Sequence, residues 1–321
     1  MQFLKVLGEG RCKRAELYDC RGEKIVILRN RKGATQRRLL RYSRKESGIT
    51  SRLPELDCNI GSVQVNRKGG KWEISSRYVQ GAPLNKTLLD SLSAEKREKL
   101  TADFAAFLLA LHTLTLDRRD ERYADQTVDE THPLLYRLGK IFHRIATLKK
   151  TYLSFSKPRG ISFDTRAFER QKREICKRFA WEEADQARLE KVIRTVCAHS
   201  DMFSYVGVCF TDFHSSNFVY DEEQARLGVL DFGNCSYKGI IYYEFVTIYT
   251  WLGKEFTQEL IRVYNALAKR DAVHLGTRHL PLEIDLSLVQ HYLILSQFQK
   301  LPRFPNRQEN VLHLLREIYP E

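Results

Sequence analysis

The chain has 321 residues, 43% of them hydrophobic and 29% charged, which indicates a globular protein, and no apolar run is long enough for a transmembrane segment. Its net charge of +13 and isoelectric point of about 9.4 favour an anionic partner and disfavour a polycationic substrate through long-range repulsion. The seven cysteines are odd in number and include no C-x-x-C pair, so we expect reduced thiols in a cytoplasmic protein rather than disulfides or a zinc site.

The chain begins with short apolar runs that predict a small sheet. Residues 3–7 and 15–18 predict two strands, with Gly8 and Gly10 between them, and residues 24–29 predict a third. A strand–G-x-G–strand hairpin can fold over the phosphates of a nucleotide, because glycine lets backbone amides approach closely. The same pattern is also typical of an ordinary β-turn, so both interpretations stay open here.

A basic run follows the third strand. Its cations are Arg29, Arg31, Lys32, Arg37, Arg38, Arg41, Arg44 and Lys45. A helix is predicted here, with Thr35 as its N-cap and an end at Ser47-Gly48, and Glu46 is the first acid of the run. The run is either a solvated helix face or an anionic-surface contact through Arg31–Lys45, for a substrate, nucleic acid or lipid head groups.

Outside the segment 205–233, the remainder of the chain predicts a β-hairpin, a domain boundary and a set of helices. Residues 60–65 and 72–79 predict the hairpin, and the Gly-Pro segment at 81–84 predicts the boundary. The predicted helices are residues 93–112, 133–148, 164–177, 183–198, 242–251, 257–270, 285–300 and 308–319. His112 ends the first of these helices, and we expect it to be structural.

The stretch from Tyr205 to Gly233 carries the strongest chemical signal. Its three apolar runs predict buried strands: residues 205–210, 218–220 and 227–230. Phosphoryl transfer requires a base that orients and deprotonates a hydroxyl, and oxygen ligands that hold Mg²⁺ against the phosphates. Asp212 fits the base, and Asn217 and Asp231 fit the metal ligands, since a hairpin between the last two strands brings them together.

The motif D-x-H-x-x-N at Asp212–Asn217, followed by L-D-F-G at Leu230–Gly233, resembles the catalytic and metal-binding loops of the aminoglycoside phosphotransferase family. That family belongs to the protein-kinase-like superfamily. The resemblance implies a two-lobed α+β fold, with a small β-rich N-lobe at 1–80, a hinge at 81–84 and a larger α-helical C-lobe at 85–321. It also implies transfer of the γ-phosphate of ATP or GTP to a hydroxyl, assisted by Mg²⁺.

The resemblance assigns roles in the N-lobe to residues that carry no signal alone. Gly8 and Gly10 cover the phosphates, and Arg29 steadies them from the third strand with Glu46 as its partner. Arg29 stands where the superfamily usually has Lys, and the geometry with which Arg binds phosphate differs from that of Lys. A solvated strand end is the alternative for Arg29.

Two further segments take their roles from the same resemblance. Y-V-Q-G-A-P-L at Tyr78–Leu84 resembles the family's hinge segment, and backbone groups of Tyr78 and Gln80, just before the hinge at 81–84, would bind the adenine edge. His214 would orient the catalytic loop or contact phosphate. The family usually has His two residues before the catalytic Asp, and this chain has Phe210 there.

The acceptor follows from charge rather than from a motif. Because the chain is strongly basic, we expect a neutral or anionic hydroxyl acceptor, such as a sugar, an anionic glycan or a protein side chain, rather than a polycation. A protein kinase acting on a large partner is one alternative. A nucleotide-binding pseudokinase is another, favoured by Phe210 and Arg29. A nucleic-acid-binding role rests on charge alone.

Overall fold

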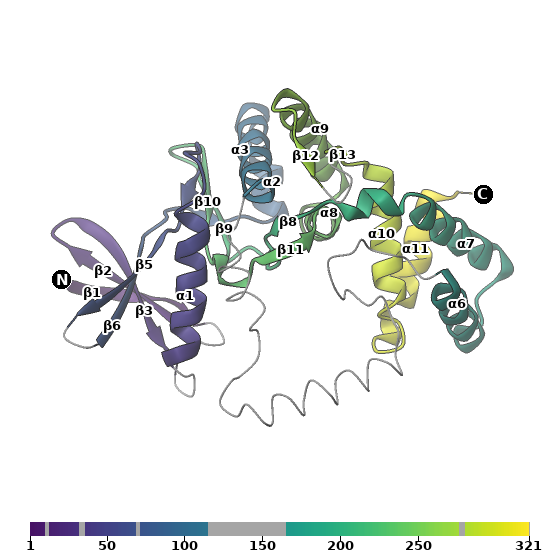
Figure 1. Cartoon of the computed structure of the whole chain (residues 1–321), viewed down its shortest axis with the longest axis horizontal. Helices are drawn as coiled ribbons and strands as arrows, with labels where there is room; N and C mark the ends of the chain where they lie inside the picture. Colours follow the sequence, from purple (N-terminus) through teal and green to yellow (C-terminus); the bar gives the residue numbers. More distant parts are fainter. Residues whose placement is uncertain (10–12, 32–35, 69–70, 115–164, 276–279, 321) are drawn as a thin grey trace. The chain divides into compact units, whose positions relative to one another are not determined.

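The computed structural model describes residues 1–9, 13–31, 36–68, 71–114, 165–275 and 280–320 (Figure 1). These residues belong to two compact units, which are described separately below. The first unit comprises Met1–Gln126, Gly207–Gly239 and Thr247–Val273, and the second comprises Thr127–Val206, Ile240–Val246 and His274–Glu321. Gly10, Thr35 and the predicted helix at 133–148 lie outside the described residues. The lobe boundary at 81–84 stays a prediction.

The first unit opens with a five-stranded antiparallel sheet in the order β1-β2-β3-β6-β5, which confirms a β-rich N-terminal part (Figure 1). Its strands are β1 (Gln2–Glu9), β2 (Lys13–Cys20), β3 (Glu23–Asn30), β5 (Val63–Lys68) and β6 (Lys71–Arg77). The three N-terminal strands and the following hairpin therefore form as predicted. Since alternate side chains of a strand point to opposite faces, β2 and β3 each present one set of residues to the core under α1, whereas β1 is exposed along its whole length.

Helix α1 (Gln36–Thr50) packs on one face of this sheet. The core between them contains Leu17, Val26, Leu28, Leu39, Val63 and Ile74, all buried. The predicted helix end at Ser47-Gly48 is wrong, because α1 continues through Gly48 to Thr50. Ile49 is fully buried, and its packing outweighs the low helix propensity of glycine.

A second, four-stranded sheet in the first unit has the order β4-β10-β9-β7. Its strands are β4 (Asn59–Ile60), β7 (Ala82–Pro83), β9 (Phe218–Asp221) and β10 (Arg226–Val229). β9 and β10 form the predicted antiparallel hairpin, closed by a turn in which Asp221 Oδ1 accepts the backbone N–H groups of Glu223 and Gln224. Gly81 has a φ of +143°, and a Cβ there would lie 2.8 Å from the Tyr220 backbone. Glycine is therefore required for β7 to approach β9.

Three helices complete the described core of the first unit: α2 (Lys86–Ser91), α3 (Ala94–His112) and α9 (Lys254–Arg270). Ser93 caps α3, accepting the Lys96 N–H through its hydroxyl. His112 Nδ1 lies 2.7 Å from the Tyr264 hydroxyl of α9, and both residues are buried. His112 therefore has the expected structural role, and its partner lies on a helix.

The second unit is mainly helical. Its helices are α6 (Thr165–Phe179), α7 (Glu183–Ala198), α10 (Leu286–Phe298) and α11 (Gln308–Ile318), with short 3-10 turns η1 (Ser200–Ser204) and η3 (Pro305–Arg307). Phe203 packs on Tyr242 and Tyr292, with ring centroids 4.8 and 5.1 Å away. Asp185 of α7 is bound by Arg188 and by Arg316 of α11.

The remaining elements are short or shared between the units. They are β8 (Val206–Cys209), β11 (Ser236–Ile240), η2 (Phe232–Asn234), α8 (Ile241–Leu252), β12 (His274–Leu275) and β13 (Leu280–Pro281). β8 pairs with β11, and β12 with β13. Among the described residues, every helix is too short or too polar to cross a bilayer.

Candidate active site

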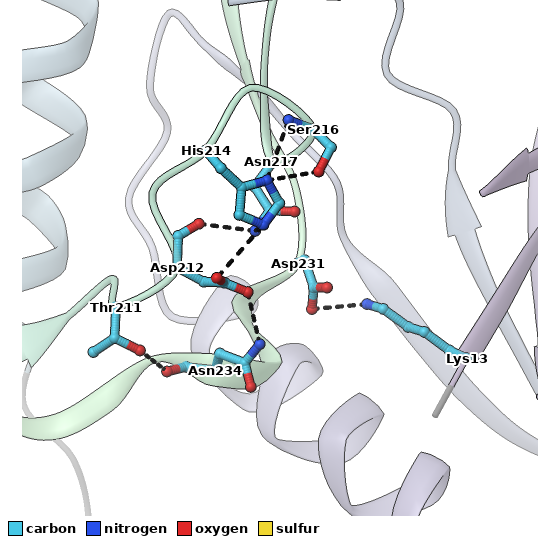
Figure 2. A network of polar contacts seen from close by, with 8 residues as sticks. All are labelled: Lys13, Thr211, Asp212, His214, Ser216, Asn217, Asp231 and Asn234. Atoms are coloured by element: carbon cyan, nitrogen blue, oxygen red, sulfur yellow. Dashed lines mark hydrogen bonds and ion pairs between the residues drawn. The ribbon is translucent and has the colours of Figure 1, made fainter. Parts of the chain in front are cut away.

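The loop between β8 and β9 carries the predicted base (Figure 2). The Asp212 side chain is 39% exposed, so solvent or a substrate can reach its carboxylate. Asn217 is buried, and its amide nitrogen donates to the Asp212 backbone oxygen at 2.9 Å. This bond closes the loop on itself and holds the predicted base beside a predicted metal ligand.

His214 lies inside the same loop. Its Nε2 is 3.5 Å from Asp212 Oδ1 and 3.1 Å from Asn217 Nδ2, while its Nδ1 is 2.6 Å from the Ser216 hydroxyl. The imidazole thus connects three side chains of the loop and can orient Asp212. This arrangement agrees with the first of the two roles predicted for His214.

Asp231 follows β10 and has a left-handed backbone, with φ 61° and ψ 63°. A residue other than glycine in this region is strained by about 1 kcal/mol, and such strain is common at functional sites. The Leu230 N–H donates to the Asn217 backbone oxygen at 2.8 Å, so the hairpin joins the segments that carry Asn217 and Asp231. Gly233 follows, where a Cβ would meet the Tyr42 ring at 2.9 Å.

Asn234 is a site residue that the sequence analysis missed. Its Nδ2 donates to Asp212 Oδ2 at 2.9 Å, and its backbone oxygen accepts a bond from the Thr211 hydroxyl (Figure 2). The segment after Phe232-Gly233 therefore returns to the catalytic loop and orients its carboxylate. The only signal in the sequence was the position of Asn234 directly after the L-D-F-G motif.

Lys13 is a second missed residue, at the start of β2. Its ammonium lies 2.8 Å from Asp231 Oδ1 and 3.6 Å from Glu46 Oε2. The Glu46 side chain is only 3% exposed, and its other oxygen accepts the Phe232 N–H at 3.3 Å. Burial, together with the nearby Asp231 charge, raises the pKa of Glu46 to about 7, against the opposing effects of Lys13 and this N–H.

The predicted pair between Arg29 and Glu46 is wrong. Arg29 Nε bonds Glu16 Oε2 at 2.8 Å, and its side chain is 56% exposed. The physical reason is the alternation of side chains along a strand. Leu28 points into the core under α1, so its neighbour Arg29 points to the opposite face of the sheet, where it lies beside Arg14, its partner on β2. Arg29 is therefore on the sheet face away from that core.

The other predicted nucleotide contacts are partly described. Gly8 lies on exposed β1 opposite Ala15, and Gly10 lies outside the described residues. Between β6 and β7, the half-buried Tyr78 packs against the core of the N-terminal sheet, and Gln80 is exposed. The adenine contact at Tyr78 and Gln80 stays a prediction.

Phe210, which departs from the family pattern, sits in an aromatic cluster. Its ring centroid lies 5.0 Å from that of Phe218 and 5.5 Å from that of Phe232. The cluster adds packing contacts between the start of the loop that carries Asp212 and the segment after Asp231, beside the hydrogen bonds of Asn234. Such aromatic pairs contribute about 0.5–1.5 kcal/mol each beyond their buried area.

The basic run from Arg31 to Lys45 is only partly available as a surface. Lys45 points inward and donates to the Cys235 backbone oxygen, and burial lowers its pKa. Arg44 stacks on Trp72 with its guanidinium carbon 4.7 Å from the ring centroid. An anionic-surface contact through the run stays a prediction.

The residues of this site fit a hard divalent cation. The hydrogen bonds of the Asn217 side chain to Asp212 and His214 both use its amide nitrogen, so its carbonyl oxygen is the atom that would ligate a metal. The Asp231 carboxylate already binds a cationic group, the Lys13 ammonium. A carboxylate and an amide oxygen at one end of a hairpin are typical ligands of Mg²⁺.

The antiparallel sheet with α1 on one face, together with the mainly helical remainder of the chain, has the arrangement of a protein-kinase-like fold. The model of a family described as "Phosphotransferase enzyme family" matches residues 76–275, more than half of the chain. The chain therefore belongs to that family, and it is a kinase-type phosphotransferase that acts on hydroxyl groups.

Solved structures share the fold at low sequence identity. APH(2")-IIia with GDP and kanamycin is 15% identical over 99% of this chain and 94% of that chain, with a TM-score of 0.55. Wild-type aminoglycoside 2'-phosphotransferase-IIIa with GDP is 16% identical over 98% and 91%, with a TM-score of 0.54. APH(2")-IIa with streptomycin and ATP is 16% identical over 99% and 93%, with a TM-score of 0.51. No curated protein matches the sequence.

Proposed function

We propose that this phosphotransferase moves the γ-phosphate of ATP or GTP to a hydroxyl of a neutral or anionic small-molecule or glycan acceptor, with Asp212 as base. The observation that carries the proposal is the hydrogen-bonded arrangement of Asp212, Asn217 and Asp231 around the β9–β10 hairpin. The solved structures of similar fold that contain GDP or ATP support a nucleotide as the phosphate donor.

Asp212 would accept the proton of the acceptor hydroxyl and direct its oxygen toward the phosphate. The bonds from Asn234 and the contact with His214 support this role, since they fix the carboxylate in one orientation. A nucleophile that is already positioned loses little further translational and rotational entropy on reaching the transition state, so the activation barrier is lower. The half-exposed position of Asp212 leaves room for an acceptor.

Asn217 and Asp231 would hold Mg²⁺. The metal supplies charge neutralisation at the phosphates when it is bound. The left-handed backbone of Asp231 and the buried amide of Asn217 present two fixed oxygen ligands, which lowers the entropic cost of binding. Phe210 supports the active-enzyme interpretation over the pseudokinase, because packing in the aromatic cluster can stabilise the loop where the family usually has His.

The charge of the chain supports a neutral or anionic acceptor. Kanamycin and streptomycin are bound in two of the similar structures, and both molecules are polycations. A protein with a net charge of +13 repels such molecules at long range. Sugars, anionic glycans and protein hydroxyls are the acceptor classes that this charge accommodates.

The test is phosphate transfer from ATP and from GTP with Mg²⁺, using neutral sugars, anionic glycans, acidic proteins and aminoglycosides as acceptors. The variants are Asp212→Asn and Asp231→Asn, and Asn is chosen at 231 because it tolerates a left-handed backbone. Asp90→Asn, an exposed acid of α2, is the matched control.

We expect the wild type and Asp90→Asn to transfer phosphate, and both site variants to lose at least about a hundredfold in rate. Incorporation into proteins alone would favour the protein-kinase alternative. Nucleotide binding without transfer to any acceptor would favour the pseudokinase and contradict the proposal.

A further inference from the structure

Two basic residues of the N-terminal sheet, Arg29 and Lys13, are candidates for binding phosphate, and they lie on opposite faces of the sheet. Arg29 of β3 belongs to a network with Glu16 and the Tyr18 hydroxyl, at 2.8 and 3.4 Å. Arg14 binds the same carboxylate at 3.0 Å. Glu16 therefore already balances Arg29, on the sheet face away from α1.

Lys13 has a different environment. Consecutive residues of a strand alternate, so Lys13 and Arg14 point to opposite faces of β2, and Lys13 shares its face with the core residue Leu17. The Lys13 side chain is 19% exposed, which is much less than the 56% of Arg29. Its ammonium bridges Asp231 and Glu46, as the close view shows for Asp231 (Figure 2).

We propose that Lys13, on β2, is the cation that binds the phosphates of the nucleotide in this chain, and that Glu46 is its anchor. The inference rests on the proposed function for the identity of the ligand. It moves the phosphate-binding cation from the third strand, where sequence resemblance put it, to the second strand.

Three observations carry this assignment. Lys13 lies three residues after Gly10 in the sequence, and its amine contacts the carboxylate predicted to hold the metal. Glu46 is buried and fixed by the Phe232 N–H, so it can hold one side of the ammonium while another N–H donates to a phosphate oxygen. A flexible lysine with three donors suits this exchange of partners better than a planar guanidinium does.

Charge also favours a movement of the Lys13 ammonium from Asp231 to a phosphate of the nucleotide. Asp231 and Glu46 share the Lys13 ammonium, and a nucleotide phosphate bound beside Asp231 would be an additional strong acceptor for it. A divalent cation at Asp231 would repel the ammonium from that carboxylate, and the phosphates are the remaining anions. Glu46 limits the movement, because a buried carboxylate without a partner is strongly unfavourable.

The test compares nucleotide affinities, so it does not depend on turnover. Binding of ATP, ADP and adenosine is measured by calorimetry with Mg²⁺ and with EDTA for the wild type, Lys13→Met, Lys13→Arg and Arg29→Met. Lys5→Met, at an exposed position of β1, is the matched control. Lys13→Met removes the counter-charge of Glu46 and can therefore destabilise the fold. If that single variant is unstable, nucleotide affinity is measured instead on the double variant Lys13→Met with Glu46→Gln.

We expect Lys13→Met to weaken ATP binding about ten- to a hundredfold, the range for a lost hydrogen bond to a charged group, and adenosine binding less than about twofold. We expect Lys13→Arg to retain part of the ATP affinity that Lys13→Met loses. Arg29→Met should leave the affinities for both ATP and adenosine unchanged. Equal losses for ATP and adenosine, or a selective ATP loss in Arg29→Met, would overturn the inference.

The outcomes separate this inference from the proposed function. If ATP binding depends on Lys13 but no acceptor is phosphorylated, the inference stands and the proposed transfer fails. If phosphate is transferred and Lys13→Met binds ATP like the wild type, the transfer stands and the inference fails. If the wild type binds no nucleotide, both are wrong.

Discussion

At the scale of single residues, Asn234 has the most direct control over the Asp212 carboxylate. It donates to Asp212 Oδ2 at 2.9 Å, and its own position is fixed by the Thr211 hydroxyl. We expect Asn234→Ala to lower kcat about ten- to a hundredfold, since a hydrogen bond to a charged group contributes about 1.5–3 kcal/mol. KM for the nucleotide should change less than about twofold, because Asn234 contacts the proposed base, Asp212, and not a group proposed to bind the nucleotide.

Steady-state kinetics on the phosphorylated acceptor would measure both parameters. Asn66→Ala, at an exposed position of β5, is the matched control. Equal changes in kcat and KM together with a lower unfolding midpoint would mean that Asn234 only supports the fold.

Residues of the site differ in how far the sequence predicts them. Asp212, Asn217 and Asp231 lie in one loop–hairpin unit, so their proximity follows from local spacing and antiparallel pairing. Lys13, in contrast, meets Glu46 only because β2 presents one particular face to α1. That face depends on strand alternation relative to a distant helix, which a single sequence does not specify.

At the scale of elements, packing decides where the sequence prediction holds. The periodic apolar positions of 183–198 predict α7 with the bounds that the structure has. α2 was not predicted, because it is short and buries only Leu89. α1 extends past Gly48 because Ile49 is buried, and no local preference of the sequence indicates that contact.

One ionic contact joins two helices of the second unit. Asp185 of α7 is 1% exposed and accepts Arg316 of α11 at 2.6 Å and Arg188 at 2.9 Å. Hydrogen bonds from Arg316 and then Arg188 lower the pKa of Asp185, although burial opposes them. We expect Asp185→Asn to destabilise the contact by about 3 kcal/mol at pH 7, the low end for breaking a buried pair, since the Arg316 side chain is half-exposed.

The pH dependence of this contact follows from the direction of the shift. The folded pKa of Asp185 is below the unfolded value, so its stabilisation is complete above about pH 4 and is lost as pH falls through the folded pKa. The difference between wild type and Asp185→Asn should therefore shrink in acid. Hydrogen exchange of the α7 and α11 amides measures it, with Glu183→Gln, an exposed acid of α7, as control. A constant difference between pH 7 and pH 3 would contradict the argument.

At the scale of the whole molecule, the net charge of +13 is the property that most separates possible acceptors. Long-range repulsion acts on a polycation before it reaches any specific contact, and it weakens when salt shortens the Debye length from about 10 Å at 0.1 M to about 3 Å at 1 M. Neutral acceptors do not experience this barrier. The salt dependence of kcat/KM therefore reports the charge of an acceptor independently of its shape.

We expect kcat/KM for the best neutral or anionic acceptor to exceed that for kanamycin at least about tenfold at low salt, because charge alone changes association rates by 10–10³. Raising the salt concentration should narrow this ratio, since screening relieves the repulsion of kanamycin and weakens any attraction of an anionic acceptor. Rates measured at 50 mM and 500 mM NaCl with one fixed nucleotide concentration test both statements. If kanamycin is the better acceptor at low salt and loses its advantage at high salt, acidic groups at the acceptor site outweigh the net charge.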